Sequence, residues 1–106
     1  MKTYPISVAR NHYRGSDPKK KANAAAENRD AATLENHVNQ LLLSQKAPVC
    51  TYGWMEISRG CGLSYETVAR LGYSIDGGSN GFTTWRHDMS YEAALEAHKN
   101  GLAKED

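Results

Sequence analysis

The side chains most often used in catalysis and metal binding are few in this chain and lie far apart. The four histidines and two cysteines of the 106 residues are His12, His37, His87, His98, Cys50 and Cys61. Their spacing matches neither a nucleophile with a base nor a pair of zinc ligands, and no paired carboxylates are found. Two cysteines do not make a disulfide framework. We therefore predict that the protein is not an enzyme, binds no metal or cofactor and keeps its thiols reduced.

A more informative stretch runs from Glu56 to Leu71 and predicts two short helices joined by a tight turn. Gly62 can adopt the left-handed conformation that ends a helix, because it has no Cβ to clash. Ser64 then suits the N-cap of the second helix, since its hydroxyl can accept a hydrogen bond from the free N–H of Thr67.

This stretch resembles the helix-turn-helix of DNA-binding regulators. The shared features are a small residue in the first helix, a turn glycine and three apolar positions, namely Ser58, Gly62, Leu63, Val68 and Leu71. The family more often has alanine where this chain has Ser58, and serine is small enough to replace it. An ordinary helical hairpin with no nucleic-acid role is the alternative.

The residues after this motif predict a β-hairpin. Tyr73–Ile75 and Phe82–Trp85 favour strands, and residues 76–81 between them are rich in Gly, Asn, Asp and Ser. A hairpin directly after the second helix resembles the wing of winged helix-turn-helix proteins, and Val49–Thr51 is placed to pair with it. A phosphate-binding glycine loop is disfavoured because β-prone residues, rather than a helix, follow the glycines.

Two further helices are predicted around this region. Residues 22–45 begin with an alanine-rich half and continue with an apolar stripe formed by Leu34, Val38, Leu41 and Leu42. The last helix follows the N-cap Ser90 and ends at Gly101. Its narrow apolar face consists of Tyr91, Leu95, His98 and Leu102. We expect this helix to close the domain or to pair with its mate in a dimer. The fold class expected is mainly α with a small β-hairpin wing.

Length and charge indicate one small domain. We divide it into a basic, flexible N-terminal arm (1–21), a winged helix-turn-helix domain (22–85) and a C-terminal helix with an acidic tail (86–106). The net charge is only +1, but a basic start and an acidic end suit a protein that meets a polyanion at one end. Two solvated termini are an equal alternative. The sequence has no transmembrane run and no signal peptide, so we expect a cytoplasmic protein.

The resemblance implies that the helix starting at Ser64 enters the major groove of double-stranded DNA. The candidate DNA contacts are Ser64, Tyr65, Glu66, Thr67, Ala69, Arg70, Ser79, Asn80, Thr83, Arg86, Arg10 and Arg14. Arg70 suits a guanine edge and Glu66 a cytosine amino group, whereas the hairpin and arm residues suit phosphates. The resemblance further implies a homodimeric transcriptional regulator of the phage or plasmid type, in a bacterial cytoplasm or nucleoid.

The second helix has one arginine and one glutamate, so it supplies almost no net attraction for DNA. The positive charge would have to come from the arm, Arg59, Arg86 and Lys46. A winged domain without a basic face can instead bind a protein partner, as an adapter or an inhibitor of a nucleic-acid enzyme. This is the alternative function.

Overall fold

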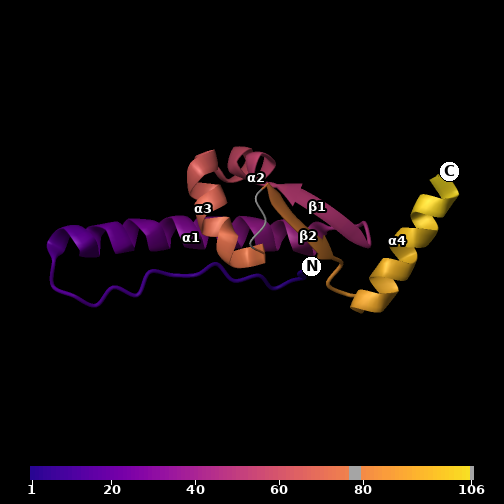
Figure 1. The fold of residues 1–106 in the computed structure, drawn as a ribbon, viewed down its shortest axis with the longest axis horizontal. Helices are drawn as coiled ribbons and strands as arrows, with labels where there is room; N and C mark the ends of the chain where they lie inside the picture. The colour runs from indigo at the N-terminus through magenta and orange to yellow at the C-terminus, as the bar shows by residue number, and fades with distance from the viewer. Residues whose placement is uncertain (77–79, 106) are drawn as a thin grey trace.

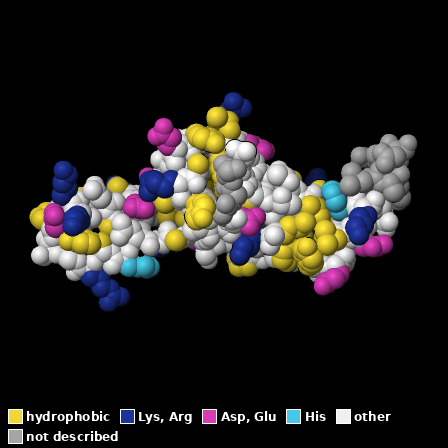
Figure 2. Space-filling model, in the orientation of Figure 1, with side chains coloured by type: hydrophobic (Ala, Val, Ile, Leu, Met, Phe, Trp, Pro, Cys, Tyr) yellow, Lys and Arg dark blue, Asp and Glu magenta, His cyan; other side chains and the backbone are white. Residues whose placement is uncertain are grey.

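The computed structural model describes residues 1–76 and 80–105, with side chains as far as Gly101. These residues form four helices and two strands (Figure 1). In chain order they are α1 (Pro18–Ser44), β1 (Val49–Gly53), α2 (Trp54–Cys61), α3 (Tyr65–Asp76), β2 (Gly81–Trp85) and α4 (Tyr91–Glu105). The prediction of a mainly helical fold with a small β element is confirmed as far as the type and number of these elements are concerned. The molecule measures 58 × 24 × 21 Å and is elongated along α1, as its surface in Figure 2 also shows.

The core forms where the C-terminal half of α1 meets α2, α3 and the strands. The buried side chains of α1 in this core are three or four residues apart and are Ala31, Leu34, Val38 and Leu42. This spacing places them on one face of the helix, as the predicted apolar stripe required. Trp54 of α2 has no exposed surface and packs against Phe82, with ring centroids 5.1 Å apart.

The turn between α2 and α3 has the predicted geometry. Gly62 is left-handed, with φ at 80°, and its N–H donates to the carbonyl of Ser58 at 3.1 Å. The N–H of Thr67 donates to the Ser64 hydroxyl at 3.2 Å, so Ser64 caps α3. Val68 and Leu71 are buried against the core. The two helices therefore meet at a sharp turn rather than forming one continuous rod.

The strand predicted at residues 73–75 is wrong, because α3 continues to Asp76. The buried residues of α3 are Val68, Leu71, Gly72 and Ile75, at the spacing of a helix. Gly72 is required by close packing, since a Cβ there would lie 2.6 Å from the ring of Trp54. The predicted hairpin across residues 76–81 is consequently not formed, and residues 77–79 of that loop lie outside the described residues.

β2 pairs antiparallel with β1, in a register that runs from Val49 opposite Trp85 to Gly53 opposite Gly81. The predicted pairing of the segment beginning at Val49 with the strand after α3 is therefore confirmed. The other edge of β2 is bonded to the start of the chain. The N–H of Lys2 donates to the carbonyl of Thr83 at 3.2 Å, and the Lys2 carbonyl accepts from the N–H of Trp85 at 3.0 Å.

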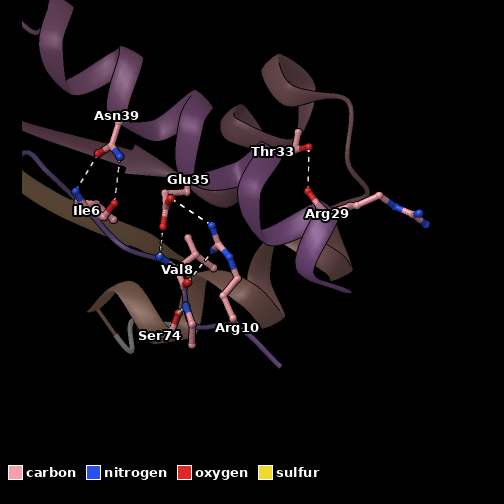
Figure 3. Close-up of polar contacts among 9 residues, drawn as sticks. Ile6, Val8, Arg10, Arg29, Thr33, Glu35, Asn39 and Ser74 are labelled. Carbon is pink, nitrogen blue, oxygen red and sulfur yellow. Dashed lines mark hydrogen bonds and ion pairs between the residues drawn. The ribbon is translucent and has the colours of Figure 1, made fainter. Parts of the chain in front are cut away.

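Residues 5–13, which we call the N-terminal strap, run beside α1 in an extended conformation (Figures 1 and 3). The side chain of Asn39 binds both backbone groups of Ile6, accepting from its N–H at 2.8 Å and donating to its carbonyl at 3.0 Å. The N–H of Val8 donates to Glu35 at 2.9 Å. Ile6 and Val8 are buried in the core.

The strap follows α1 in the opposite direction for several turns. Asn11 repeats the arrangement of Ile6, because its N–H donates to the Asn28 side chain at 2.7 Å and its carbonyl accepts from it at 3.0 Å. From Ile6 to Asn11 an extended chain advances about 16.5 Å. From Asn39 back to Asn28 a helix also advances about 16.5 Å. The equal advance explains why both ends of the strap reach a partner on α1.

The structure differs here from the predicted flexible arm. α1 begins at Pro18 rather than at residue 22, because Asp17 caps it by accepting from the N–H of Lys19 at 3.0 Å, and proline is favourable at the first helical position. The strap has a fixed place because side chains of α1 replace the strand partner that its backbone would otherwise need.

α4 lies at the end of the molecule opposite the N-terminus of α1 (Figure 1). Ser90 caps it as predicted, with its hydroxyl accepting from the N–H of Ala93 at 3.1 Å. The helix continues beyond the predicted end at Gly101 to Glu105. It packs on β1 and β2, where Tyr91 contacts Trp85, and its Ala94 has no exposed surface. In the described part of the chain, no helix combines the length and the apolar character needed to cross a bilayer.

Candidate nucleic-acid interface

The predicted contacts on α3 form one exposed surface, which we call the outer face of α3. It consists of the N-cap Ser64 with Tyr65, Glu66, Arg70 and Tyr73. Glu66, Arg70 and Tyr73 are four and three residues apart, so they project from the same side of the helix. Tyr73, which the sequence analysis did not include, is 69% exposed, and Tyr65 is 38% exposed. The sequence signal for Tyr73 was its spacing, three residues after Arg70 and seven after Glu66, which places it on the same side of a helix.

Two of the predicted contacts are turned partly inward. Ala69 packs against the core, and the hydroxyl of Thr67 accepts from Ser64 at 2.8 Å as part of the cap. Both residues therefore contribute to the folding of α3 and present little surface to a ligand.

Arg70 connects the outer face of α3 to α1. Its Nη1 lies 3.1 Å from Oε1 of Glu27, and the two side chains are 57% and 33% exposed. An ion pair this exposed contributes at most about 1 kcal/mol, since water competes for both partners. The guanidinium of Arg70 can therefore leave Glu27 for a base or a phosphate at small cost.

The other predicted arginines of the strap and the turn after β2 are held by the protein itself. Arg10 donates to the carbonyl of Val8 at 2.8 Å and forms an ion pair with Glu35 at 3.2 Å (Figure 3). Arg86 binds Asp88 at 2.6 Å and the carbonyl of Lys46 at 3.0 Å. Its hydrogen bond to Asp88 lowers the pKa of that carboxyl below its ordinary value.

Of the predicted contacts after α3, Asn80 and Thr83 form hydrogen bonds with α2 and β1. Ser79 lies outside the described residues. Asn80 is exposed, and its carbonyl accepts from the N–H of Trp54 at 3.0 Å. Thr83 is on β2 and shares a hydrogen bond of 3.1 Å with Thr51 across the sheet. Asn80 and Thr83 therefore stabilise the sheet and its connection to α2.

A second exposed surface lies at the N-terminal end of α1, where Lys and Arg side chains project from the end of the molecule away from α4 (Figure 2). We call it the basic tip, and it consists of Arg14, Lys19, Lys20 and Lys21. Asp17 is the only acidic residue before Glu27 in the sequence, and it is occupied in capping α1. The predicted site included Arg14 and missed the three lysines, although they are consecutive in the sequence.

The basic tip lies close to Arg70 along α1. Lys19 to Lys21 precede Glu27, the partner of Arg70, by six to eight residues, which is about 9–12 Å of helix. Between them is a shallow hollow of about 330 Å³, lined by Asn11, Tyr13, Lys20, Asn23 and Glu27. A polar surface thus extends from the basic tip to the outer face of α3.

The described residues offer no arrangement of three or more His, Cys, Asp or Glu side chains that would hold a metal ion. A second hollow of about 240 Å³ lies between the strap and the end of α3 and is lined by Lys2, Thr3, Pro5, Ile6, Ser7, Ser74 and Ile75. Comparisons of the chain with known protein families, with curated proteins and with solved structures find no match.

Proposed function

We propose that this protein binds double-stranded DNA in the manner of a small helix-turn-helix regulator of the winged type. In this proposal the outer face of α3 enters the major groove, and the basic tip contacts phosphates beside that groove. The observation that supports it best is the exposed face of a helix that starts directly after a left-handed turn. Occupation of a specific DNA site by such a protein would regulate transcription.

The side chains on this face are suited to base edges. Arg70 can donate two hydrogen bonds to guanine, and Glu66 can accept one from the cytosine amino group. Tyr65 and Ser64 stand at the N-terminal end of α3, the part of a recognition helix that contacts bases and nearby phosphates.

The basic tip would supply most of the attraction. Asp17 is the only acidic residue before Glu27 in the sequence and it caps α1, while Glu27 lines the same hollow as Lys20 of the tip. If all four neutralise phosphates, the logarithm of the DNA affinity should fall with the logarithm of the salt concentration at a slope of about −3.6. The hollow beside Glu27 lies between the tip and Arg70, on the path that a DNA backbone would follow.

The test is selection of binding sites from a pool of random duplexes. The wild-type protein should enrich a common sequence, and Arg70→Ala should weaken binding to it by about tenfold or more, since a bidentate base contact contributes about 1–3 kcal/mol. Arg29→Ala is the matched control. Arg29 is also an exposed arginine, but it is two residues after Glu27 and so lies on the opposite side of α1, pointing away from the strap (Figure 3). If the pool yields no common sequence, or if both variants bind equally well, the proposal is wrong.

Binding of a protein partner is the second candidate, because Tyr73 and Tyr65 are exposed on α3 while Arg70 is already paired with Glu27. Exposed aromatic residues are typical of protein interfaces. Salt separates the two functions. DNA binding through several phosphates weakens steeply as salt increases, whereas an interface formed by tyrosines should change little.

A further inference from the structure

Aromatic side chains from distant parts of the sequence meet beside α4. Tyr4 contacts His87, with ring centroids 5.9 Å apart, and Trp85 contacts Tyr91, with centroids 5.3 Å apart. Tyr4 and Tyr91 are nevertheless 36% and 42% exposed. Figure 2 shows hydrophobic surface next to α4 at this end of the molecule.

Between Tyr91 and Gly101, where its side chains are described, α4 has little support from the rest of the chain. Among the side chains described between Tyr91 and Gly101, Ala94 is the one that is fully buried. Leu95 and His98 are only partly buried, and they follow Tyr91 by four and seven residues. A helix of this length is marginal in water unless one of its faces is packed. The edge formed by Tyr91, Leu95 and His98 is only partly covered by the rest of the chain, so this helix would gain stability if a second surface packed against the edge.

Two of the charges beside this edge, those of Glu92 and Lys99, are self-complementary, and Glu96 between them lies about 40° farther from the edge around the helix. Glu92 and Lys99 are seven residues apart, which is two turns, so both flank the edge on the same side. When two identical helices pack antiparallel about a two-fold axis, such positions face each other. Glu92 of each copy would then lie opposite Lys99 of the other copy, and the pair would form twice.

We propose that this edge of α4 and the adjoining aromatic residues Tyr4 and Trp85 form a two-fold interface between two copies of the chain. The exposed aromatic rings supply the apolar contact, and the two Glu92–Lys99 pairs fix the antiparallel register. The basic tip lies at the opposite end of the molecule and stays uncovered in such a dimer. Self-association is measured without DNA, so its failure and a failure of DNA binding are distinguishable.

The experiment is sedimentation equilibrium of the full chain. The wild type should have twice the monomer mass of 11.7 kDa. Glu92→Lys places like charges opposite each other at two sites, so dimerisation should weaken by about tenfold or more. Exchange of both charges in Glu92→Lys/Lys99→Glu should restore the dissociation constant to within about threefold of the wild type.

Glu56→Lys is the matched control, because Glu56 is also exposed, lies on α2, and gives the same change in net charge. It should leave dimerisation unchanged, and circular dichroism should show that all variants keep their helices. A monomeric wild type at concentrations up to about 100 μM would overturn the proposal, since a specific interface is populated there. The proposal would also be overturned if Glu92→Lys dimerised as tightly as the wild type, or if the double variant dimerised as weakly as Glu92→Lys.

Discussion

Replacement of Gly72 by alanine should destabilise the protein, although alanine is the better helix former. In an exposed helix this change would add about 0.8–1.0 kcal/mol to the free energy of unfolding. At Gly72 the new Cβ would lie 2.6–3.0 Å from three ring carbons of Trp54, well inside van der Waals contact. Trp54 has no exposed surface and is packed against Phe82, so its ring cannot move aside freely.

Overpacking of a core costs about 1–3 kcal/mol. The close approach at Gly72 places the cost in the upper part of that range, and the gain in helix propensity offsets about 1 kcal/mol. We therefore expect a net loss of about 1–2 kcal/mol and a fall in the melting temperature of about 4–8 °C per kcal/mol. Urea unfolding followed by circular dichroism at 222 nm measures this loss.

Two further variants test the reasoning. Gly101→Ala is the matched control, because a Cβ at Gly101 has open space around it, and this variant should gain about 0.5–1 kcal/mol. Trp54→Phe removes the ring carbons that a Cβ at Gly72 would meet, so Gly72→Ala should cost less in that background than in the wild type. A Gly72→Ala protein as stable as the wild type would refute the packing of α3 against Trp54.

The other predictions concern the turn, the strap and a buried tyrosine. Gly62→Ala should lose about 1–2 kcal/mol, because alanine is strained at a φ of 80°, and Gly62→Asn should lose less, as urea titrations would show. Asn39→Ala removes both hydrogen bonds to Ile6, so it should lose about 1–3 kcal/mol and speed proteolytic cleavage before Pro18. Burial, and next the hydrogen bond with Cys50, raises the pKa of Tyr52 above its ordinary value of 10.0. The folded state then keeps a proton that the unfolded chain releases, so the free energy of unfolding should fall as the pH rises above 10, and Tyr52→Phe should flatten this fall.

Features that depend on neighbouring residues could be predicted from the sequence. The left-handed Gly62, the cap at Ser64 and the apolar stripe ending at Leu42 each follow from side-chain size or from hydrogen bonds within a few residues. The coarse fold class followed from the same signals. The outer face of α3 could also be predicted, because Glu66 and Arg70 are four residues apart in a helix whose start the sequence indicates.

Features that depend on distant residues could not be predicted in this way. The end of α3 was assigned to a strand because Tyr73 and Ile75 favour strands, but Leu71 and Ile75, four residues apart, are both buried in the core, which is the spacing of a helix. The strap was assigned to a flexible arm because its partners on α1 are far along the sequence. The same limit applies to Arg70, whose ion-pair partner Glu27 precedes it by 43 residues.

The strap and the residues before it also constrain the order in which the chain can fold. The backbone of the strap binds side chains that come into line only when α1 is helical, and the hydroxyl of Thr3 donates to the carbonyl of Trp85 across 82 residues of sequence. Closing a loop of that size has an entropic cost that only completed structure at the other end can offset. We therefore expect the first residues of this chain to be among the last to become ordered, and a chain interrupted before β2 would leave Lys2 and Thr3 without their partners on that strand.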